Sequence, residues 1–353
     1  MKAIIQDRYG SPDTALELRE VATPTIADDE VLIRTRAAGI HIGDAFAVRG
    51  SPFPVRLMTG LRRPKVGVPG FDVAGTVEAV GSAVTNHRLG DEVFGAATGT
   101  CAELVRAKTD LMVPKPAGLS FEEAAAIPTS GLAALHGLRD AGKLQPGQHV
   151  LINGASGGVG TFEVQIAKAL GAHVTGVCSS ANVEMVRSLG ADRVIDYNRE
   201  DFTAAGDRYD LIVDNVENRP LSAVRRALTR RGVLVLNSGT GATGLRMFGR
   251  LLWPLILSPF TSHTLRRYLS NPKRADLEWL ADRAADGSVR PVVGSTYPLA
   301  DTRDALRHLE GGHSRGKVVI TVVQRERPAA AALVGRADVT PALRTDRELA
   351  GVR

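Results

Sequence analysis

A glycine-rich turn at residues 150–160 is the part of the sequence whose residue types and spacing point most directly to chemistry. An apolar run, Val-Leu-Ile, leads into small residues, with Ala155, Gly157 and Gly160 at the spacing of a dinucleotide-binding turn whose first glycine is replaced by alanine. In such a turn the middle glycine lets the backbone approach a pyrophosphate, and the last glycine lets the following helix pack on the strand. The helix N-terminus then offers N–H groups to the phosphates. The alternative is a tight turn without a ligand. The expected dinucleotide-binding residues are Gly154, Ala155, Ser156, Gly157, Gly158, Val159 and Gly160.

The end of the next expected strand bears on which dinucleotide binds. NAD sites place an Asp or Glu about 20 residues after the turn, where it binds the ribose diol. Here the strand ends at Ser179 and Ser180, and no acidic residue precedes Glu184. Without a carboxylate a 2′-phosphate meets no repulsion, so the sequence favours NADP(H) over NAD(H). The hydroxyls of Ser179, Ser180 and Tyr197 are the expected neutral ligands, and the two residues after Ser180 supply no cation for the phosphate.

The elements that must position this turn alternate between apolar strands and helical patterns. Such alternation predicts an α/β fold, a doubly wound parallel sheet with helices on both faces. The expected segments are the strands 150–152, 174–177, 194–197, 211–214 and 233–237 and the helices 159–170, 183–189 and 221–228.

The rest of the chain has a different texture. Up to about residue 120, short β-rich runs separated by Gly and Pro predict a compact β-dominated module. After residue 268 the alternation stops, and a helix, a β-like run, a second helix and a final strand are expected to return to that first module. The predicted organisation is a β-rich substrate domain at 1–122, a dinucleotide-binding domain at 123–268, a return at 269–325 and a loosely ordered tail at 326–353.

Composition and charge limit the classes of protein. The chain has 353 residues, 44% of them hydrophobic, which is enough for two globular domains. Its net charge of +6 suits an anionic cofactor, and no nucleic-acid partner is expected. The isolated Cys101 and Cys178 support neither a disulfide framework nor a cysteine-built zinc site. The most apolar run, 251–260, is interrupted by prolines and is shorter than the roughly 20 residues of a bilayer span. We therefore expect a cytoplasmic protein without a membrane partner.

Several motifs in order make the sequence resemble a known family. They are Ala37–Asp44, Pro69–Gly81, Gly90–Gly95, Ala124–Gly131, the glycine turn, Leu189–Asp192 and Gly316–Val319. This series is similar to the quinone oxidoreductase (zeta-crystallin-like) branch of the medium-chain dehydrogenase/reductase superfamily, over about residues 1–323. The resemblance implies a GroES-like substrate domain, a Rossmann domain, a small-molecule substrate in the cleft between them and a homodimer.

Departures from the zinc-dependent relatives predict an enzyme without a metal. Those relatives carry a cysteine where this sequence has His41, a Gly-His-Glu where it has Gly-Phe-Asp ending at Asp72, and often a four-cysteine lobe that is missing here. A catalytic zinc needs three protein ligands. His41 and Asp72 give at most two, so we predict no metal site and no Lewis-acid route.

His41 and Asp44 are the candidate catalytic residues. The quinone oxidoreductase pattern commonly has Asn in place of His41 and often Tyr in place of Phe46. A histidine there, with an ordinary pKa near neutrality, would donate a hydrogen bond to a substrate carbonyl or relay a proton. It is equally well explained as a histidine satisfied by backbone groups. Asp44 either orients His41 or caps a helix, and capping is favoured.

The resemblance also implies positions around the cofactor and the substrate, each with an ordinary turn residue as its alternative. The further cofactor-binding residues it implies are Thr129 beside the nicotinamide, Asn215 after the fourth Rossmann strand, and Ser238 and Gly239 after the fifth. The residues expected to line an apolar substrate pocket are Phe46, Phe248 and Trp253, the last two being equally suited to a dimer seam.

Two classes of function remain open. The first is an enzyme that transfers hydride from NADPH to a quinone or an activated C=C bond, or, as a variant, one that interconverts an alcohol and a carbonyl. The second is a dinucleotide-bound protein whose basic tail holds nucleic acid and whose catalysis is weak. The tail lacks the aromatic residues that single-strand binders use for stacking, which favours the enzyme.

Overall fold

Six strands from residues 149–236 and 264–266 form a parallel sheet. The computed structural model describes residues 1–237, 262–312 and 314–322 of the chain. The strands pair in the order β10-β9-β8-β11-β12-β13, and every neighbouring pair is parallel. The order reverses between β8 and β11, the kind of place where open α/β sheets bind ligands. The strands are β8 (His149–Asn153), β9 (His173–Cys178), β10 (Arg193–Asp196), β11 (Tyr209–Asp214), β12 (Leu228–Leu236) and β13 (Thr264–Arg266).

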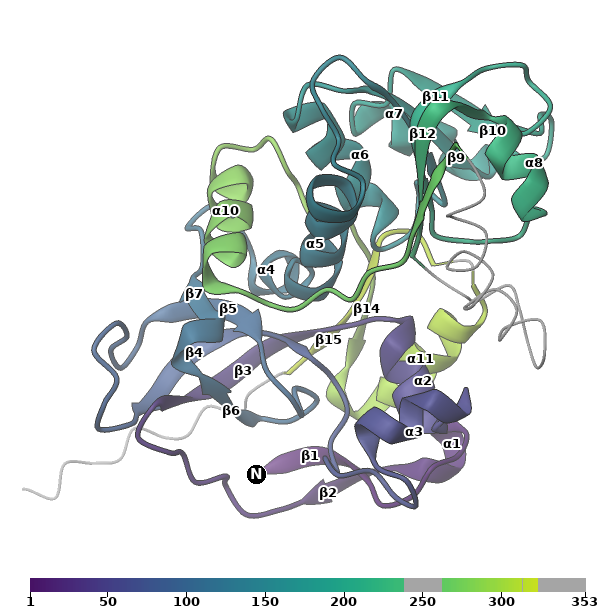
Figure 1. The fold of residues 1–353 in the computed structure, drawn as a ribbon. Coiled ribbons are helices and arrows are strands. Elements are labelled where there is room, and N and C mark those ends of the chain that lie inside the picture. Colours follow the sequence, from purple (N-terminus) through teal and green to yellow (C-terminus); the bar gives the residue numbers. More distant parts are fainter. Residues whose placement is uncertain (238–261, 313, 323–353) are drawn as a thin grey trace, which may run out of the picture. The chain divides into compact units, whose positions relative to one another are not determined.

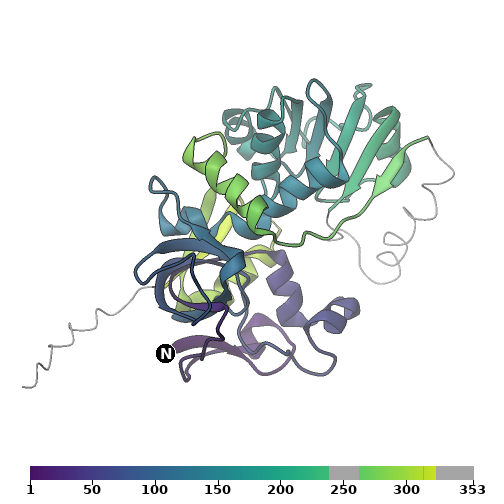
Figure 2. The same ribbon diagram turned by 60° about the vertical axis from the view of Figure 1, so that its left-hand side comes forward.

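Helices cover both faces of this sheet. They are α5 (Pro128–Leu135), α6 (Gly160–Ala169), α7 (Val183–Ser188) and α8 (Leu221–Arg226). Side chains alternate between the faces of a strand, so Val150 and Ile152 of β8 pack in one core cluster with residues of α5 and α6, whereas Leu151 packs in another with Val224 of α8. Figure 2 shows helices packed against the parallel strands. The predicted doubly wound fold is confirmed.

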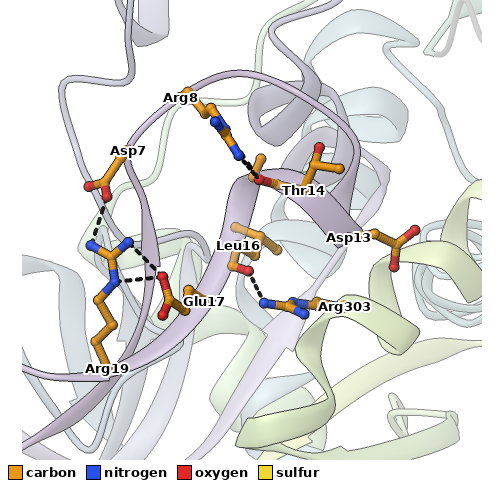
Figure 3. A pocket seen from close by; sticks show the side chains of 9 residues that line it. Asp7, Arg8, Asp13, Thr14, Leu16, Glu17, Arg19 and Arg303 are labelled. Atoms are coloured by element: carbon orange, nitrogen blue, oxygen red, sulfur yellow. Dashed lines mark hydrogen bonds and ion pairs between the residues drawn. The ribbon is translucent and has the colours of Figure 1, made fainter.

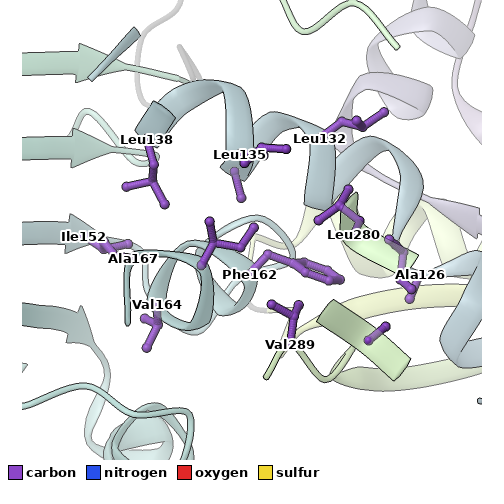
Figure 4. Packing of buried hydrophobic residues seen from close by; sticks show 14 of the residues in the cluster. Ala126, Leu132, Leu135, Leu138, Ile152, Phe162, Val164, Ala167, Leu280 and Val289 are labelled. Atoms are coloured by element: carbon purple, nitrogen blue, oxygen red, sulfur yellow. The ribbon is translucent and has the colours of Figure 1, made fainter. Parts of the chain in front are cut away.

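The first of these clusters extends well beyond the sheet. Figure 4 shows Phe162 of α6 lying near Leu280 and Val289, which come from the later part of the chain. Leu280 belongs to α10 (Arg274–Ala285), which contacts α5. Segments that are distant in sequence therefore share the same core as the parallel sheet.

A second sheet of seven strands is formed mainly by the N-terminal part of the chain (Figure 1). Its order is β14-β15-β3-β4-β5-β7, with β6 also paired to β3, and all pairs except β14–β15 are antiparallel. Strands β14 and β15, from residues 293–321, thus lie beside β3. The strands are β3 (Glu30–Ile40), β4 (Asp72–Val80), β5 (Glu92–Ala96), β6 (Leu104–Lys108), β7 (Met112–Pro114), β14 (Val293–Pro298) and β15 (Lys317–Thr321).

The remaining elements surround this sheet. They are the antiparallel pair β1 (Lys2–Gln6) and β2 (Leu16–Glu20) and the helices α1 (Pro12–Ala15), α2 (Ile42–Arg49), α3 (Phe53–Thr59), α4 (Phe121–Ala125) and α11 (Thr302–Glu310). The exact domain limits stay predictions, and the predicted tail at 326–353 lies outside the described residues.

Some boundaries differ from expectation. The helix expected at 221–228 ends at Arg226, and β12 already begins at Leu228, five residues before the strand start expected at Val233. The early start follows from pairing, because Leu228 pairs with Tyr209 across an irregularity in the β11–β12 register. Cys101 and Cys178 are both buried free thiols. Among the described residues no helix combines the length and apolar character needed to cross a membrane.

Candidate functional site

The glycine turn leaves β8 at the reversal of strand order and leads into α6. Gly154 has a φ of 87°, a left-handed conformation that suits glycine. The N–H groups of Gly154 and Ala155 donate to the carbonyl of Val177 (3.1 and 3.0 Å), which fixes the turn to β9. No side chain caps α6 at Val159, and the N–H groups of Ser156 and Val159 donate no hydrogen bond within the described part of the chain. Such unused donors at a helix N-terminus suit a phosphate.

Two glycines of the turn are required for different reasons. A Cβ on Gly160 would lie 2.1 Å from the carbonyl oxygen of Gly154 and 2.8 Å from the Cα of Ala155, so the packing of α6 itself demands glycine. Among the described residues, a Cβ on Gly157 would meet nothing closer than the Gly154 oxygen at 3.4 Å, an ordinary contact. The packing of the described residues thus leaves space over Gly157, and the pyrophosphate of a dinucleotide fits the chemistry of that space.

A distant segment holds the other side of the turn. The N–H of Gly316 donates to the carbonyl of Ser156 (2.9 Å), and Gly157 and Gly316 form an isolated parallel bridge. A Cβ on Gly158 would lie 3.3 Å from the Cδ of Lys317. The beginning of β15, a strand of the seven-stranded sheet, therefore adjoins the turn that emerges from the parallel sheet.

Polar side chains join the carboxyl ends of β8, β11 and β12. Asn153 donates to Asp214 (Nδ2–Oδ1, 2.8 Å). Asn215, a predicted cofactor contact, has both ends of its amide engaged within the protein. Its Nδ2 donates to Glu163 Oε2 of α6 (2.6 Å), and its Oδ1 accepts from Asn237 Nδ2 (2.6 Å). The protein therefore orients the Asn215 amide before any ligand arrives.

Glu163 is a fully buried carboxyl group that the sequence did not reveal as part of the site. Burial raises its pKa to about 8, although the hydrogen bond from Asn215 opposes this rise. Its Oε1 has no hydrogen-bond partner among the described residues. Burial therefore favours the protonated form of Glu163 in the fold. Its position in α6, between Phe162 and Val164, gives no local sign of such a role.

The predicted 2′-phosphate ligands lie at the ends of β9 and β10. Ser180 Oγ donates to Asp196 Oδ2 (2.6 Å) and accepts from Asn198 Nδ2 (3.1 Å), and Ser179 Oγ bonds to the side chain of Asn182. The Tyr197 side chain is exposed. The hydrogen bond from Ser180 lowers the pKa of Asp196, so an ionised carboxylate stands beside Ser180. Asp196 ends β10, the third strand, whereas NAD sites usually carry their acid at the end of the second.

His41 and Asp44 cap the first turn of α2. The Nδ1 of His41 accepts from the N–H of Gly43 (2.9 Å), and Asp44 Oδ2 accepts from the backbone N–H of His41 (2.8 Å), a reciprocal capping box. Because Nδ1 is an acceptor, the proton of a neutral His41 is on Nε2, which lies 3.6 Å from Asp44 Oδ2. The ring stacks on Phe71 at 5.8 Å. Only the Nε2 edge of His41 is left to meet a substrate.

Asp44 Oδ2 accepts from the backbone N–H of His41 and lies 3.6 Å from the ring nitrogen Nε2. It is buried at the third position of α2 and supports the cap from within the helix, while the His41 side chain itself caps the first turn. Burial raises the pKa of Asp44, and its Oδ1 has no hydrogen-bond partner within the described residues. The favoured capping interpretation thus agrees with its contacts.

Asp72 and Lys317 form a buried ion pair next to this cap, with Nζ 3.2 Å from Oδ2. Both side chains are almost completely buried. Asp72 Oδ1 also accepts from the N–H of Thr129 (2.9 Å) and from its hydroxyl. The hydroxyl of Thr129, a predicted nicotinamide neighbour, is therefore bonded to the protein. Both partners of the ion pair stand in motifs quoted from the sequence, but no local pattern pairs residues 245 positions apart.

Asp72 is also one of the two residues considered as zinc ligands. Both carboxylate oxygens of Asp72, at the place of the glutamate in zinc-dependent relatives, are engaged with Thr129 and Lys317. In the described ranges no three His, Cys, Asp or Glu side chains gather in a group that could hold a metal ion. The absence of a metal stays a prediction, which metal analysis of the purified protein tests.

Several predicted residues are not part of these contacts. Phe46, a predicted pocket residue, is half-buried on α2. The others, Ser238, Gly239, Phe248 and Trp253, lie outside the described residues.

A surface hollow of about 280 Å³ lies elsewhere, around β2 and its approach (Figure 3). Arg19 sits there between Asp7 and Glu17, and Arg303 of α11 donates to the carbonyl of Leu16. Its charges neutralise each other, and none of its lining residues belongs to the cofactor turn or the His41 cap. We do not assign it to the active site.

Comparisons with known proteins agree with this geometry. Residues 27–137 match the alcohol dehydrogenase GroES-like domain, and residues 189–320 match the zinc-binding dehydrogenase family. The chain is 31% identical to the chloroplast envelope quinone oxidoreductase homolog of Arabidopsis thaliana, over 91% of this chain and 98% of that protein. It is 30% identical to the NADPH-dependent alkenal/one oxidoreductase of the same plant, over 91% and 79% of the two chains.

The structural comparison gives the same family. The Escherichia coli quinone oxidoreductase, solved in complex with NADPH, superposes with a TM-score of 0.77 at 27% identity, over 91% of this chain and all of that one. The protein is therefore an oxidoreductase that uses a nicotinamide cofactor. By fold, motifs and relatives, the chain belongs to the quinone oxidoreductase branch of the medium-chain dehydrogenase/reductase superfamily.

Proposed function

We propose that this protein reduces a quinone or an activated C=C bond of a small molecule with NADPH. One observation carries the proposal: no described residue packs so closely that it requires glycine at 157, yet this glycine stands where a pyrophosphate must approach the backbone. Relatives named for quinone and alkenal/one reduction support the substrate class.

The residues present fit the cofactor. The unused N–H groups of Ser156 and Val159 are donors for phosphate oxygens, and the space over Gly157 admits them. When bound, NADPH supplies the hydride. The protein binds and orients it, with Gly316, the residue before β15, supporting the turn.

His41 has a hydrogen-bond donor that the helix cap does not use. His41 presents Nε2–H because Nδ1 is bonded to Gly43. A donor at this edge stabilises the negative charge that develops on a quinone or enone oxygen during reduction. The proton that completes the reduction comes from this group or from water.

Carbonyl reduction is the second candidate, and the position of the His41 proton favours it. The neutral ring carries its proton on Nε2 because Nδ1 accepts from Gly43, and an alkoxide needs such a proton donor more than an activated alkene does. Oxidation of NADPH with a quinone, an enone and an aldehyde under matched conditions separates the candidates. Turnover of the aldehyde alone would replace the first proposal by the second, and no turnover of any of them would favour the binding-protein reading.

The preference for NADPH over NADH is part of the proposal, and two residues act on it in opposite ways. Asp196 beside Ser180 repels a 2′-phosphate, while Arg199, whose Nε lies 3.6 Å from Asp196 Oδ2, attracts it. Asp196→Asn should increase the ratio of kcat/KM for NADPH to that for NADH, and Arg199→Gln should decrease it. A wild type that prefers NADH, with neither ratio changed in the variants, would contradict this choice of cofactor.

A further inference from the structure

Residues 53–66, which we call the α3 segment, expose an unusual amount of apolar surface. Five of its six large apolar side chains, at positions 53, 57, 58, 61 and 66, are between 47% and 76% exposed, and Val55 is half-buried. Elsewhere in the described parts of the chain, exposed side chains of this kind occur singly, at Leu18, Leu89, Tyr197 and Leu269. Scattered apolar residues need no explanation, but a group of them indicates an interaction surface.

The same segment is positively charged. Arg62, Arg63 and Lys65 are exposed, and none of them has an ion-pair partner within the described ranges. No acidic residue occurs between Arg49 and Asp72. Exposed apolar side chains next to unpaired cations form the pattern of a segment that lies in the headgroup region of a membrane.

The protein holds this segment in place. The hydroxyl of Tyr9 bonds to Thr59 Oγ1 and to the carbonyl of Gly60 (2.8 and 2.6 Å). Arg56 donates from Nε to the carbonyl of Gly50 (2.8 Å), and its guanidinium lies 4.7 Å from the centre of the Tyr9 ring. These contacts anchor the inner side of α3, so its apolar side chains are presented outward without a large cost in ordering.

We propose that the α3 segment docks the protein on the surface of an anionic lipid bilayer. Leu57, Met58 and their apolar neighbours would insert among the headgroups, while the cations at 62, 63 and 65 meet lipid phosphates. A second copy of the chain is disfavoured as the occupant, because it would bring the same three cations face to face. We expected no membrane partner from the lack of an apolar span, but surface binding needs no span.

Vesicle co-sedimentation tests the proposal without reference to catalysis. The full-length protein should bind vesicles that contain phosphatidylglycerol and phosphatidylcholine, bind phosphatidylcholine alone weakly, and be released by high salt. Arg62→Gln with Arg63→Gln should weaken binding to the mixed vesicles roughly 25-fold, since each cation near an anionic surface contributes about a factor of five. Leu57→Ser with Met58→Ser should weaken it roughly tenfold or more.

The matched control is Leu89→Ser with Leu269→Ser, which removes two leucines that are 68% and 88% exposed outside the segment. It should leave vesicle binding unchanged, and all variants should keep the wild-type circular dichroism and Tm. Equal weakening by the control, or no binding of the wild type to mixed vesicles, would overturn the proposal. So would a change from dimer to monomer in the Leu57/Met58 variant by light scattering, because the segment would then be an interface between copies.

Discussion

Two strand–turn–helix segments of this protein differ in how the helix begins. After β8 the turn enters α6 without a side-chain cap, and the backbone N–H groups of Ser156 and Val159 donate to no residue that the structure describes. After β3 the chain enters α2 through a reciprocal cap, in which the side chains of His41 and Asp44 accept hydrogen bonds from backbone N–H groups of the first turn. An open helix N-terminus is free to bind an anion, whereas a capped one has already used its donors. The open turn before α6 is therefore suited to binding a ligand, and the capped turn before α2 to structural support.

The first and largest expected effect concerns the open turn. Gly157→Val should reduce NADPH affinity beyond measurement, because the side chain fills the space the pyrophosphate needs, while the fold and Tm are kept. Isothermal calorimetry and thermal unfolding check both parts.

The matched variant for this prediction is Gly160→Ala. Its Cβ would lie 2.1 Å from the Gly154 oxygen, so it should destabilise the protein itself. If Gly157→Val binds NADPH normally, the open turn is not the cofactor site.

The second prediction concerns the ion pair next to the capped turn. Lys317→Met should lower the free energy of unfolding by about 3–5 kcal/mol, because it leaves the Asp72 carboxylate buried without its partner. Adding Asp72→Asn removes that charge and keeps an acceptor for Thr129, so the double variant should recover much of the loss. Urea unfolding measures both. A double variant less stable than Lys317→Met alone would show that the pair is not coupled in this way.

The third prediction asks whether the cap also takes part in catalysis. If Nε2 of His41 donates to the substrate oxygen, His41→Ala should lower kcat/KM by ~10²-fold with little change in NADPH affinity. A purely capping residue would cost about 1 kcal/mol of stability instead. His41→Asn keeps a capping oxygen and a donor, so it should retain most of both. The measurements are kcat/KM with an enone and a carbonyl substrate, together with the Tm of each variant. If kcat/KM were unchanged in both variants, the role of His41 would be limited to capping α2.

The fourth and smallest effect concerns Glu163, buried under the open turn. In the unfolded chain its carboxyl loses a proton near its ordinary pKa of 4.5, and in the fold only near 8. The fold binds more protons between these values, so this group makes the wild type less stable as the pH rises through that window. Glu163→Gln should therefore gain Tm relative to the wild type from about pH 5 to about pH 8. A Tm difference that does not vary with pH would show that Glu163 is ionised in the fold.

How far the sequence could predict these regions depends on how local each signal is. The strand, glycine turn and helix at 149–169 are encoded by neighbouring residues, and each lies within a residue or two of its expected place. The role of Asp72 was not predictable in the same way, because its partner Lys317 joins it only after β15 pairs with β3.

Sequence patterns also did not indicate which partners individual side chains would contact. The apolar spacing in α6 marks the helix, but it does not show that Glu163 on that helix is buried as well and accepts a hydrogen bond from Asn215. Likewise, Asp44 was expected to cap a helix or to orient His41. It does support the cap, but the sequence did not show that His41 is the N-cap residue, whose Nδ1 accepts from the N–H of Gly43. Side-chain contacts of this kind follow from backbone geometry that the sequence pattern leaves open.

The bridge between Gly157 and Gly316 has a consequence for how the protein is made. Synthesis proceeds from the N-terminus, so the parallel sheet through β13 leaves the ribosome well before the residues that support its glycine turn. A nascent chain that has reached α10 has the turn but neither Gly316 nor the Lys317 side chain beside Gly158. We expect such a chain to hold the dinucleotide poorly, so that cofactor capture occurs late and marks chains in which β15 has joined the N-terminal sheet.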